Sequence, residues 1–335
     1  MSVISPELAE PLSAADEPET RRSIRPVPSG PDRAFRTIVL TAAVSVLVIM
    51  GLIGLFLLLR STDALGEAGW SFLTEYQWQP NADIIGIAGV LTGTVLIAGV
   101  ALVIAVPVAF GTALFIAEYA KGRIRRVLVS LIDLMAAVPS IVYGLWGFFF
   151  LQPRIISLSR WLSDHASFLP FFRVEAQTFA ASTFIAGVVV SLMIIPISCA
   201  IMREVFSQAP VGEREGAIAL GATRWGVIRT VVLPFGRGGM IGGIMLGLGR
   251  ALGETIAVYL IISVLFAPPD RLIRVLETGG ASISSLIALR YGDSDSSGLS
   301  ALLAAGLVLF LLTLVVNSMA SVIVNRSRSG ASTEI

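Results

Sequence analysis

Long runs of apolar residues with almost no charge recur along most of this chain, and they leave little choice of fold. Residues 37–59 and 84–117 contain no Asp, Glu, Lys or Arg. A helix needs about 20 apolar residues to cross a bilayer core of about 30 Å. Because lipid offers no hydrogen-bond partners to the backbone, such runs must form helices. Only 14% of the residues are charged, so the sequence predicts an all-α integral membrane protein.

Six of these runs are predicted to be transmembrane helices, and polar tails flank them. Residues 1–36 are rich in Pro, Ser and Glu and hold five arginines, so we expect a disordered cytoplasmic tail. A shorter cytoplasmic tail is expected over 326–335. The run 84–117 exceeds what one crossing needs, so its first residues are expected to precede the helix. The predicted spans are 37–59, 84–117, 127–151, 176–202, 238–267 and 299–325.

The distribution of Lys and Arg predicts how these spans are oriented. With the N-terminus in the cytoplasm, sixteen Lys and Arg residues lie inside and seven lie outside, while Arg250 falls within the membrane. Cytoplasmic loops usually carry the excess of positive charge. We therefore expect both the N- and C-termini to be cytoplasmic, and an odd number of spans would break this pattern.

The residues that are rare in this chain disfavour several functions. The only lysine, Lys121, is not part of the Gly-Lys-Ser/Thr sequence that a Walker A loop requires. Any ATPase must therefore be a separate polypeptide, and the chain itself is not expected to be an enzyme. One cysteine, Cys199, and one histidine, His165, leave little for metal binding or imidazole catalysis, so no metal or cofactor is predicted. The net charge of +1 gives no reason to expect nucleic acid.

The longest predicted cytoplasmic loop, 203–237, is unusual in its small residues. Gly216 and Ala217 lie in a stretch expected to be helical, Gly221 is expected to end it, and a second helix is expected to stop before Pro234. A helix surface that carries few side chains can lie close against a groove on a partner. The loop is therefore interpreted as a docking site for another protein, with a plain surface helix-turn-helix as the alternative.

The fifth predicted span contains two charges and a stripe of glycines. Each isolated charge at the membrane centre costs about 2.5–3.5 kcal/mol on insertion scales. Arg250 and Glu254 are spaced i,i+4, so on one helix face they can pair. Intramembrane ionisable residues more often line a polar path, with a purely structural pair as the alternative. The glycines are interpreted mainly as a packing face, whose partner in a permease could be the same helix of a second subunit. They are Gly239, Gly243 and Gly247.

Three hydroxyl side chains near the expected membrane centre are further candidates for a substrate path. They are Thr94, Ser140 and Thr255. The alternative is that each hydroxyl donates a hydrogen bond to a carbonyl of its own helix.

The loop resembles a motif of the permeases of binding-protein-dependent ABC importers, E-A-A-x3-G-x9-I-x-L-P. Every spacing is kept, and the two departures, Gly216 for Ala and Val231 for Ile, preserve the size class. The resemblance implies a type I ABC importer permease fold, with a permease core over 84–325 and a coupling helix that seats in an ATPase subunit. The matching positions are Glu215, Gly216, Ala217, Gly221, Val231, Leu233 and Pro234.

Two further segments resemble the phosphate permeases of this family. Residues 250–255 read R-A-L-G-E-T, and the following Ile-Ala-Val is similar to the PstC-type subunit rather than to its PstA-type partner. Residues 138–147 resemble the PstC-type third span. Because arginine offers a planar fork of donors suited to phosphate, Arg250 is hypothesised to pair with Glu254 when the path is closed and to contact the anion when it opens.

The predicted function is that of the permease subunit of an ATP-driven phosphate importer in the cell membrane. It would form half of a translocation path that works by alternating access. The resemblance implies a second permease subunit of the PstA type, two ATPase subunits of the PstB type and an extracytoplasmic phosphate-binding protein of the PstS type. Three alternatives stay open: an ABC permease for another oxyanion or solute, an ion-coupled secondary transporter, and a membrane enzyme.

Overall fold

The computed structural model describes the chain outside residues 1–29, 80–83, 176–177, 263–270, 272 and 329–335. The chain divides into two compact units, Met1–Leu52 and Ile53–Ile335, each of which is described by itself. In the first unit the described residues belong to α1 (Gly30–Arg60), which continues into the second unit. All the remaining elements lie in the second unit.

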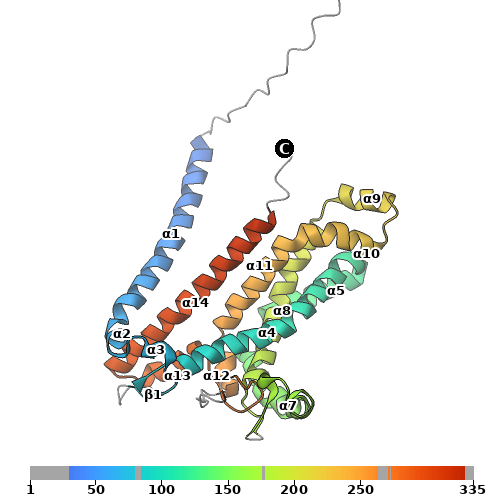
Figure 1. Cartoon of the computed structure of the whole chain (residues 1–335). Coiled ribbons are helices and arrows are strands. Elements are labelled where there is room, and N and C mark those ends of the chain that lie inside the picture. The colour runs from blue at the N-terminus through green and yellow to red at the C-terminus, as the bar shows by residue number, and fades with distance from the viewer. Residues whose placement is uncertain (1–29, 80–83, 176–177, 263–270, 272, 329–335) are drawn as a thin grey trace, which may run out of the picture. The chain divides into compact units, whose positions relative to one another are not determined.

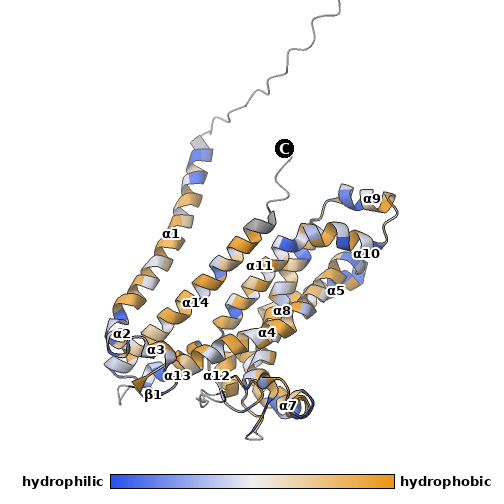
Figure 2. Ribbon diagram, viewed as in Figure 1, coloured by the Kyte–Doolittle hydropathy of each residue, from blue (hydrophilic) through white to orange (hydrophobic). Residues whose placement is uncertain are grey.

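Six helices of the described residues are long and apolar enough to cross a membrane. They are Gly30–Arg60, Ala88–Tyr119, Ser140–Ala166, Thr183–Ser207, Arg224–Leu252 and Ser296–Val324. Apolar residues dominate these helices, as Figure 2 shows. Within the described part of the chain, strands are limited to the short antiparallel pair β1 (Trp78–Gln79) and β2 (Ile84–Ile85). The prediction of an all-α membrane protein with six spans is therefore confirmed.

The ends of the spans differ from their predicted positions. Residues 30–36, predicted to belong to the disordered tail, are helical in α1, and the rest of that tail lies outside the described residues. Similarly, α14 (Ser296–Arg328) extends into the predicted C-terminal tail. The short segment expected before the second span is confirmed, because β2 precedes α4 (Ala88–Leu114). A π-helical turn, η2 (Phe115–Tyr119), completes that span.

The long helices of the second unit run between two opposite ends (Figure 1). At one end, here called the α9 end, lie α9 (Val211–Ala219) and α10 (Arg224–Val227). At the other, here called the α13 end, lie α2 (Thr62–Ala68), α3 (Ser71–Thr74) and α13 (Ile283–Arg290). The chain therefore separates a projecting helical loop from a compact cap of short elements.

The core of the second unit is built around α8 (Thr183–Ser207), which packs most extensively against α4 and then against α11 (Leu233–Leu252). Small buried residues of α4 recur at helical spacing and include Ala98, Ala101 and Ala105. They allow the two backbones to come close, which is how helices associate in lipid. Larger side chains of α8, such as Ile185 and Met193, fill the same hydrophobic cluster.

The glycine stripe of α11 is a packing face, as interpreted from the sequence. A Cβ added at Gly247 would lie 2.7 Å from Oγ of Ser198, and one at Gly239 would overlap the side chain of Val205. Both contacts are with α8 of the same chain. The partner of this stripe is therefore found within the chain rather than in a second subunit.

The third crossing is interrupted, so the continuous helix predicted over 127–151 is wrong. α5 (Gly122–Ala137) ends before Pro139, and the chain resumes as α6 (Ser140–Trp146), the π-helical turn η3 (Gly147–Leu151) and α7 (Gln152–Ala166). Val138 and Pro139 have extended backbone with ψ of 128° and 143°. A residue before proline is driven out of the helical region by the proline ring, which accounts for the break.

The fifth crossing differs from its prediction at both ends. The helix predicted to stop before Pro234 instead runs from Arg224 to Leu252, and a π-helical turn, η5 (Ile228–Val232), lies directly before the proline. Proline is tolerated in the first turn of a helix, and here it occupies the first turn of α11. The helix then ends at Leu252, and α12 (Ile256–Ile262) begins after a short break. Residues 263–267 of the predicted span lie outside the described residues.

Charged residues at the α13 end join the segments that lead into α8 and α13. Nη2 of Arg274 lies 2.9 Å from Oε1 of Glu175, and Nη1 lies 3.3 Å from Oε2 of Glu277. Arg271 pairs with the same Glu277 at 2.9 Å. The hydrogen bond from Arg274 holds the pKa of Glu175 below its ordinary value. These contacts fix the loops from which the two helices start.

We predict that Gly93→Ala destabilises the fold, because an added Cβ would overlap the backbone carbonyl oxygen of Ala281. A backbone atom cannot turn aside, and overpacking of this kind costs about 1–3 kcal/mol. Gly99→Ala in the same helix is the matched control, because no described atom lies within 4 Å of a Cβ there. Thermal unfolding in detergent should give Gly93→Ala the lower midpoint, and equal midpoints for the two variants would contradict the close contact.

Candidate functional site

The two interrupted crossings meet beside their breaks. α6, which follows the break at Pro139, packs against α12, which follows the break after Leu252. A Cβ added at Gly144 would lie only 2.9 Å from Cα of Ala257, so the two backbones approach closely. Non-helical backbone is tolerated at membrane depth only where it is buried in protein or lines a polar cavity. This junction is therefore the first candidate for a substrate path.

Glu254 lies in the break of the fifth crossing and is buried, with 7% of its surface exposed. Its Oε1 accepts a hydrogen bond of 3.2 Å from the backbone N–H of Ala257, in the first turn of α12. Its backbone carbonyl accepts one of 2.8 Å from Oγ of Ser284. A carboxylate at this position satisfies a free N–H group and is stabilised by the positive end of the helix dipole. Glu254 therefore caps the second half of the interrupted helix.

Arg250 lies in the last turn of α11, and its side chain is exposed although the adjacent Ala251 and Leu252 are buried. No ion pair joins Arg250 to Glu254 among the described residues, so the i,i+4 pair is absent from this structure, and pairing in a closed path stays a prediction. The physical reason is that α11 ends at Leu252 with Gly253 as its cap, so one continuous helix face does not carry both charges.

A polar residue that was not predicted lies close to Gly249, the residue before Arg250. Oδ1 of Asn317, in α14, would be 3.9 Å from a Cβ added at Gly249. Asn317 is exposed on the chain. The signal that could have identified it is a single amide within an apolar helix, because such groups in membranes usually have a polar partner.

Buried hydroxyls connect α4 to the start of α13 beside Glu254. Oγ1 of Thr94 accepts a hydrogen bond of 2.9 Å from the N–H of Ile283 and donates one of 2.7 Å to the carbonyl of Val90. The predicted bond to its own helix is thus confirmed, together with a second bond between helices. Ser282 and Ser285 form a reciprocal capping box at the start of α13. The sequence analysis missed these serines, although Ser-x-x-Ser before an apolar run is a recognisable cap.

The other predicted hydroxyls flank the two breaks. Oγ1 of Thr255 donates to the carbonyl of Gly253 at 3.2 Å, and Ser140 is the first residue of α6. Tyr143 reaches back across the first break, where its hydroxyl donates to the carbonyl of Met135 at 3.0 Å. Of the five predicted path residues, Glu254 and Thr94 are therefore connected by hydrogen bonds to Ser284 and Ile283, which are adjacent in α13. Arg250 and Thr255 lie on either side of Glu254, and Ser140 lies at the other break.

The predicted docking loop projects from the α9 end (Figure 1). Glu215, Gly216 and Ala217 lie on α9, which has no buried residue, and the predicted helix end at Gly221 is confirmed by its φ of 85°. Leu233 and Pro234 begin α11. Four large apolar side chains of the loop between Val211 and Trp225 are exposed, with Leu220 reaching 92%. They are Val211, Ile218, Leu220 and Trp225.

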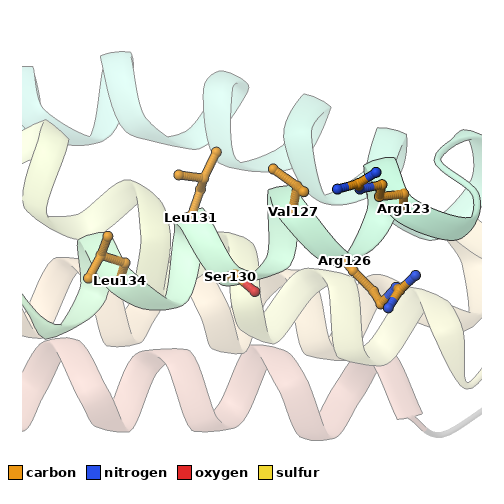
Figure 3. A pocket seen from close by; sticks show the side chains of 6 residues that line it. All are labelled: Arg123, Arg126, Val127, Ser130, Leu131 and Leu134. Atoms are coloured by element: carbon orange, nitrogen blue, oxygen red, sulfur yellow. The ribbon is translucent and has the colours of Figure 1, made fainter.

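A shallow groove along α5 starts near the same end (Figure 3). Its polar end carries Arg123 and Arg126, and its apolar part is formed by Val127, Leu131 and Leu134. Arginines that follow an apolar helix face usually mark the level of the membrane surface. The groove therefore indicates where this end of the bundle leaves the apolar layer.

An all-α bundle with two interrupted crossings and a projecting helical loop defines a membrane transport protein of the permease class. Residues 107–329 match the model of the family described as binding-protein-dependent transport system inner membrane component. The chain belongs to this family and is a multi-pass membrane transport subunit.

Characterised relatives span almost the whole chain. The phosphate transport system permease protein PstC 2 of Mycobacterium tuberculosis is 39% identical over 313 residues, covering 92% of this chain and 95% of the relative. The phosphate transport system permease protein PstC of Xylella fastidiosa is 41% identical over 288 residues, covering 84% and 87%. The crystal structure of a bacterial ABC transporter involved in import of the acidic polysaccharide alginate has a chain with 17% identity and a TM-score of 0.54, which covers 87% of this chain and 96% of that one. This likeness supports the permease fold.

We predict that Thr94→Val destabilises the junction between α4 and α13. Valine keeps the shape of threonine but leaves the buried N–H of Ile283 without its acceptor, which costs about 1–3 kcal/mol. Thr94→Ser keeps the hydroxyl and is the matched control. The measurement is the unfolding midpoint of each purified variant. A midpoint for Thr94→Val that equals that of Thr94→Ser would contradict this role of the hydroxyl.

Proposed function

We propose that this chain is the PstC-type permease subunit of an ATP-driven phosphate importer. The observation that carries the proposal is sequence similarity to phosphate permeases. One of them is 39% identical to this chain over 92% of its length. The complete R-A-L-G-E-T segment over 250–255 lies at the break of the fifth crossing, where the backbone is not a continuous helix. An ABC permease for another oxyanion is the competing function that the experiment below must separate.

The exposed side chain of Arg250 supports a path shared with a second permease subunit. A guanidinium left facing lipid would cost about 2.5–3.5 kcal/mol on insertion scales. If a PstA-type subunit covers this face, Arg250 becomes part of the wall of a polar path and can offer its planar fork to phosphate. We propose that Thr255 and Ser140 line the same path. Glu254 and Thr94 hold the break in position from behind, through their bonds to α12 and α13.

The loop at the α9 end is proposed as the site that receives the ATPase. Its exposed apolar side chains are costly in water and would be covered by a partner. The sequence positions that match the family motif lie on α9, at the turn after it and at the start of α11. They are Glu215, Gly216, Ala217, Gly221, Leu233 and Pro234, with Val231 in η5 just before α11.

The complete importer is proposed to hold two permease subunits, two PstB-type ATPase subunits and a PstS-type binding protein outside the cell. The α9 end and both chain termini are proposed to be cytoplasmic, which agrees with the excess of Lys and Arg expected there. ATP-driven movement of the loop would then open and close the path by alternating access.

We predict that Arg250→Ala lowers phosphate uptake about tenfold or more, the equivalent of one charge-assisted hydrogen bond. Arg250→Lys keeps the charge but loses the planar fork, so its uptake should be intermediate. Arg290→Ala, at an exposed position on α13, is the control for loss of one arginine.

The measurement is uptake of radiolabelled phosphate by cells that contain equal amounts of assembled complex, with sulfate and molybdate as competitors. If sulfate or molybdate suppressed uptake by the wild-type complex as strongly as unlabelled phosphate does, that result would contradict phosphate as the substrate. Full uptake by Arg250→Ala would contradict the role of this residue.

A further inference from the structure

A second ionic contact lies at the α9 end, apart from the candidate path. Glu118 belongs to η2, the turn that ends the second crossing, and Arg214 belongs to α9. Nη1 of Arg214 donates a hydrogen bond of 3.2 Å to Oε2 of Glu118, and Nη2 lies 3.0 Å from Oε1. The guanidinium therefore faces both oxygens of the carboxylate but makes one hydrogen bond to it, since Oε1 of Glu118 is buried without a hydrogen-bond partner among the described residues.

Arg214 makes a second hydrogen bond, to another helix. Its Nη2 donates to the backbone carbonyl of Phe206 at 2.6 Å, in the last turn of α8. Phe206 is fully buried, and its ring meets that of Phe110 of α4 edge-on, with 6.0 Å between centroids. A Cβ added at Gly236 of α11 would lie 2.8 Å from the same ring. One side chain thus fastens α9 to the tightly packed place where α4, α8 and α11 converge.

The environment of the pair makes it stronger than an ordinary surface contact. The side chains of Arg214 and Glu118 are 23% and 12% exposed, and they line a hollow together with Ile218, Val227 and Ile228. Partly buried charges are screened less by salt than exposed ones, and removal of one partner leaves the other charge uncompensated.

α9 has few other means of attachment. It contains no buried residue, and no described atom lies within 4 Å of a Cβ added at Gly212 or Gly216. The helix that follows the turn at Gly221 is continuous with the fifth crossing, but α9 itself precedes that turn. Arg214 therefore supplies side-chain bonds from α9 to the second and fourth crossings, in addition to the short connection 208–210 from α8 and the contacts of α9 with α10 and η5.

We propose that Glu118 and Arg214 form a strut that makes α9 move as one body with the ends of the second and fourth crossings. The inference rests on the proposed function, in which α9 receives movement from an ATPase subunit. Coupling between distant sites needs a rigid physical connection or a two-state element that both sites bias. Without the strut, α9 can follow the ATPase while the crossings stay in place, and ATP is then hydrolysed without transport.

The test uses the assembled complex in lipid vesicles with its ATPase and binding protein. The variants are Glu118→Gln, Arg214→Gln and the double variant, each of which removes charge with little change in polarity. The quantity measured is phosphate transported per ATP hydrolysed, for equal amounts of complex. We expect this ratio to fall about fivefold or more, the lower range of coupling between sites, while hydrolysis continues. The double variant should be no worse than either single variant, because both remove the same pair.

Glu204→Gln is the matched control, because Glu204 is an exposed carboxylate in α8 at the same end of the bundle. It should leave the ratio unchanged. A pair that only stabilises the fold would reduce the yield of complex but leave the ratio of transport to hydrolysis at the wild-type value, and that result would overturn the strut.

The wild-type complex distinguishes this failure from failure of the proposed function. If it transports another oxyanion and no phosphate, the proposed substrate is wrong, and the same ratio measured with that oxyanion still tests the strut. An unchanged ratio in the variants of a complex that does transport phosphate overturns the strut alone.

Discussion

Backbone groups freed where a helix stops inside a membrane must find partners within the protein, since lipid supplies none. The described residues contain two such places, after Ala137 and after Leu252. At the first, the hydroxyl of Tyr143 satisfies the carbonyl of Met135. At the second, the carboxylate of Glu254 receives the N–H of Ala257, and Ser284 donates to the carbonyl of Glu254. The packing of the other helices keeps these hydrogen-bonding partners close to one another.

Close helix contacts supply that support. Alanines of α4 and glycines of α11 allow both helices to pack closely against α8. These three helices form a rigid frame, because rotating a single side chain cannot loosen contacts between backbones. α13 is tied to α4 through Thr94 and to the break through Ser284, so its capping serines join the frame to the candidate path. In the proposed mechanism, movement of α9 reaches this frame through the second and fourth crossings.

Hydropathy and charge predicted the number of spans, and several features of the loop 203–237 were also predicted. These predictions succeeded because they depend on residues that are near one another in sequence. Gly221 ends α9 as expected, since its left-handed backbone is a local requirement. The break at Pro139 had a local signal in the proline itself, yet 127–151 was predicted as one span. Pro234 shows the opposite outcome, because a preceding π-helical turn lets the helix continue.

The interactions that sequence could not predict join distant segments. Glu118 and Arg214 are 96 positions apart, and Thr94 and Ile283 are 189 positions apart. The pairing of Arg250 with Glu254 is absent from this structure for a related reason. Spacing of i,i+4 places two side chains on one face only when the helix continues, and whether it continues is decided by the capping and tertiary bonds of Glu254.

The central claim is that the break in the fifth crossing places Arg250 on the wall of a water-filled path rather than against lipid. It is tested most directly by the reactivity of Arg250→Cys, in the assembled complex, with a charged thiol reagent that cannot enter lipid. The natural Cys199 is buried and gives little background. Val103→Cys, on a 77% exposed position of α4, provides the comparison for a lipid-facing site. The cysteine at position 250 should react much faster than the one at position 103. Equal, slow reaction at both positions would contradict it.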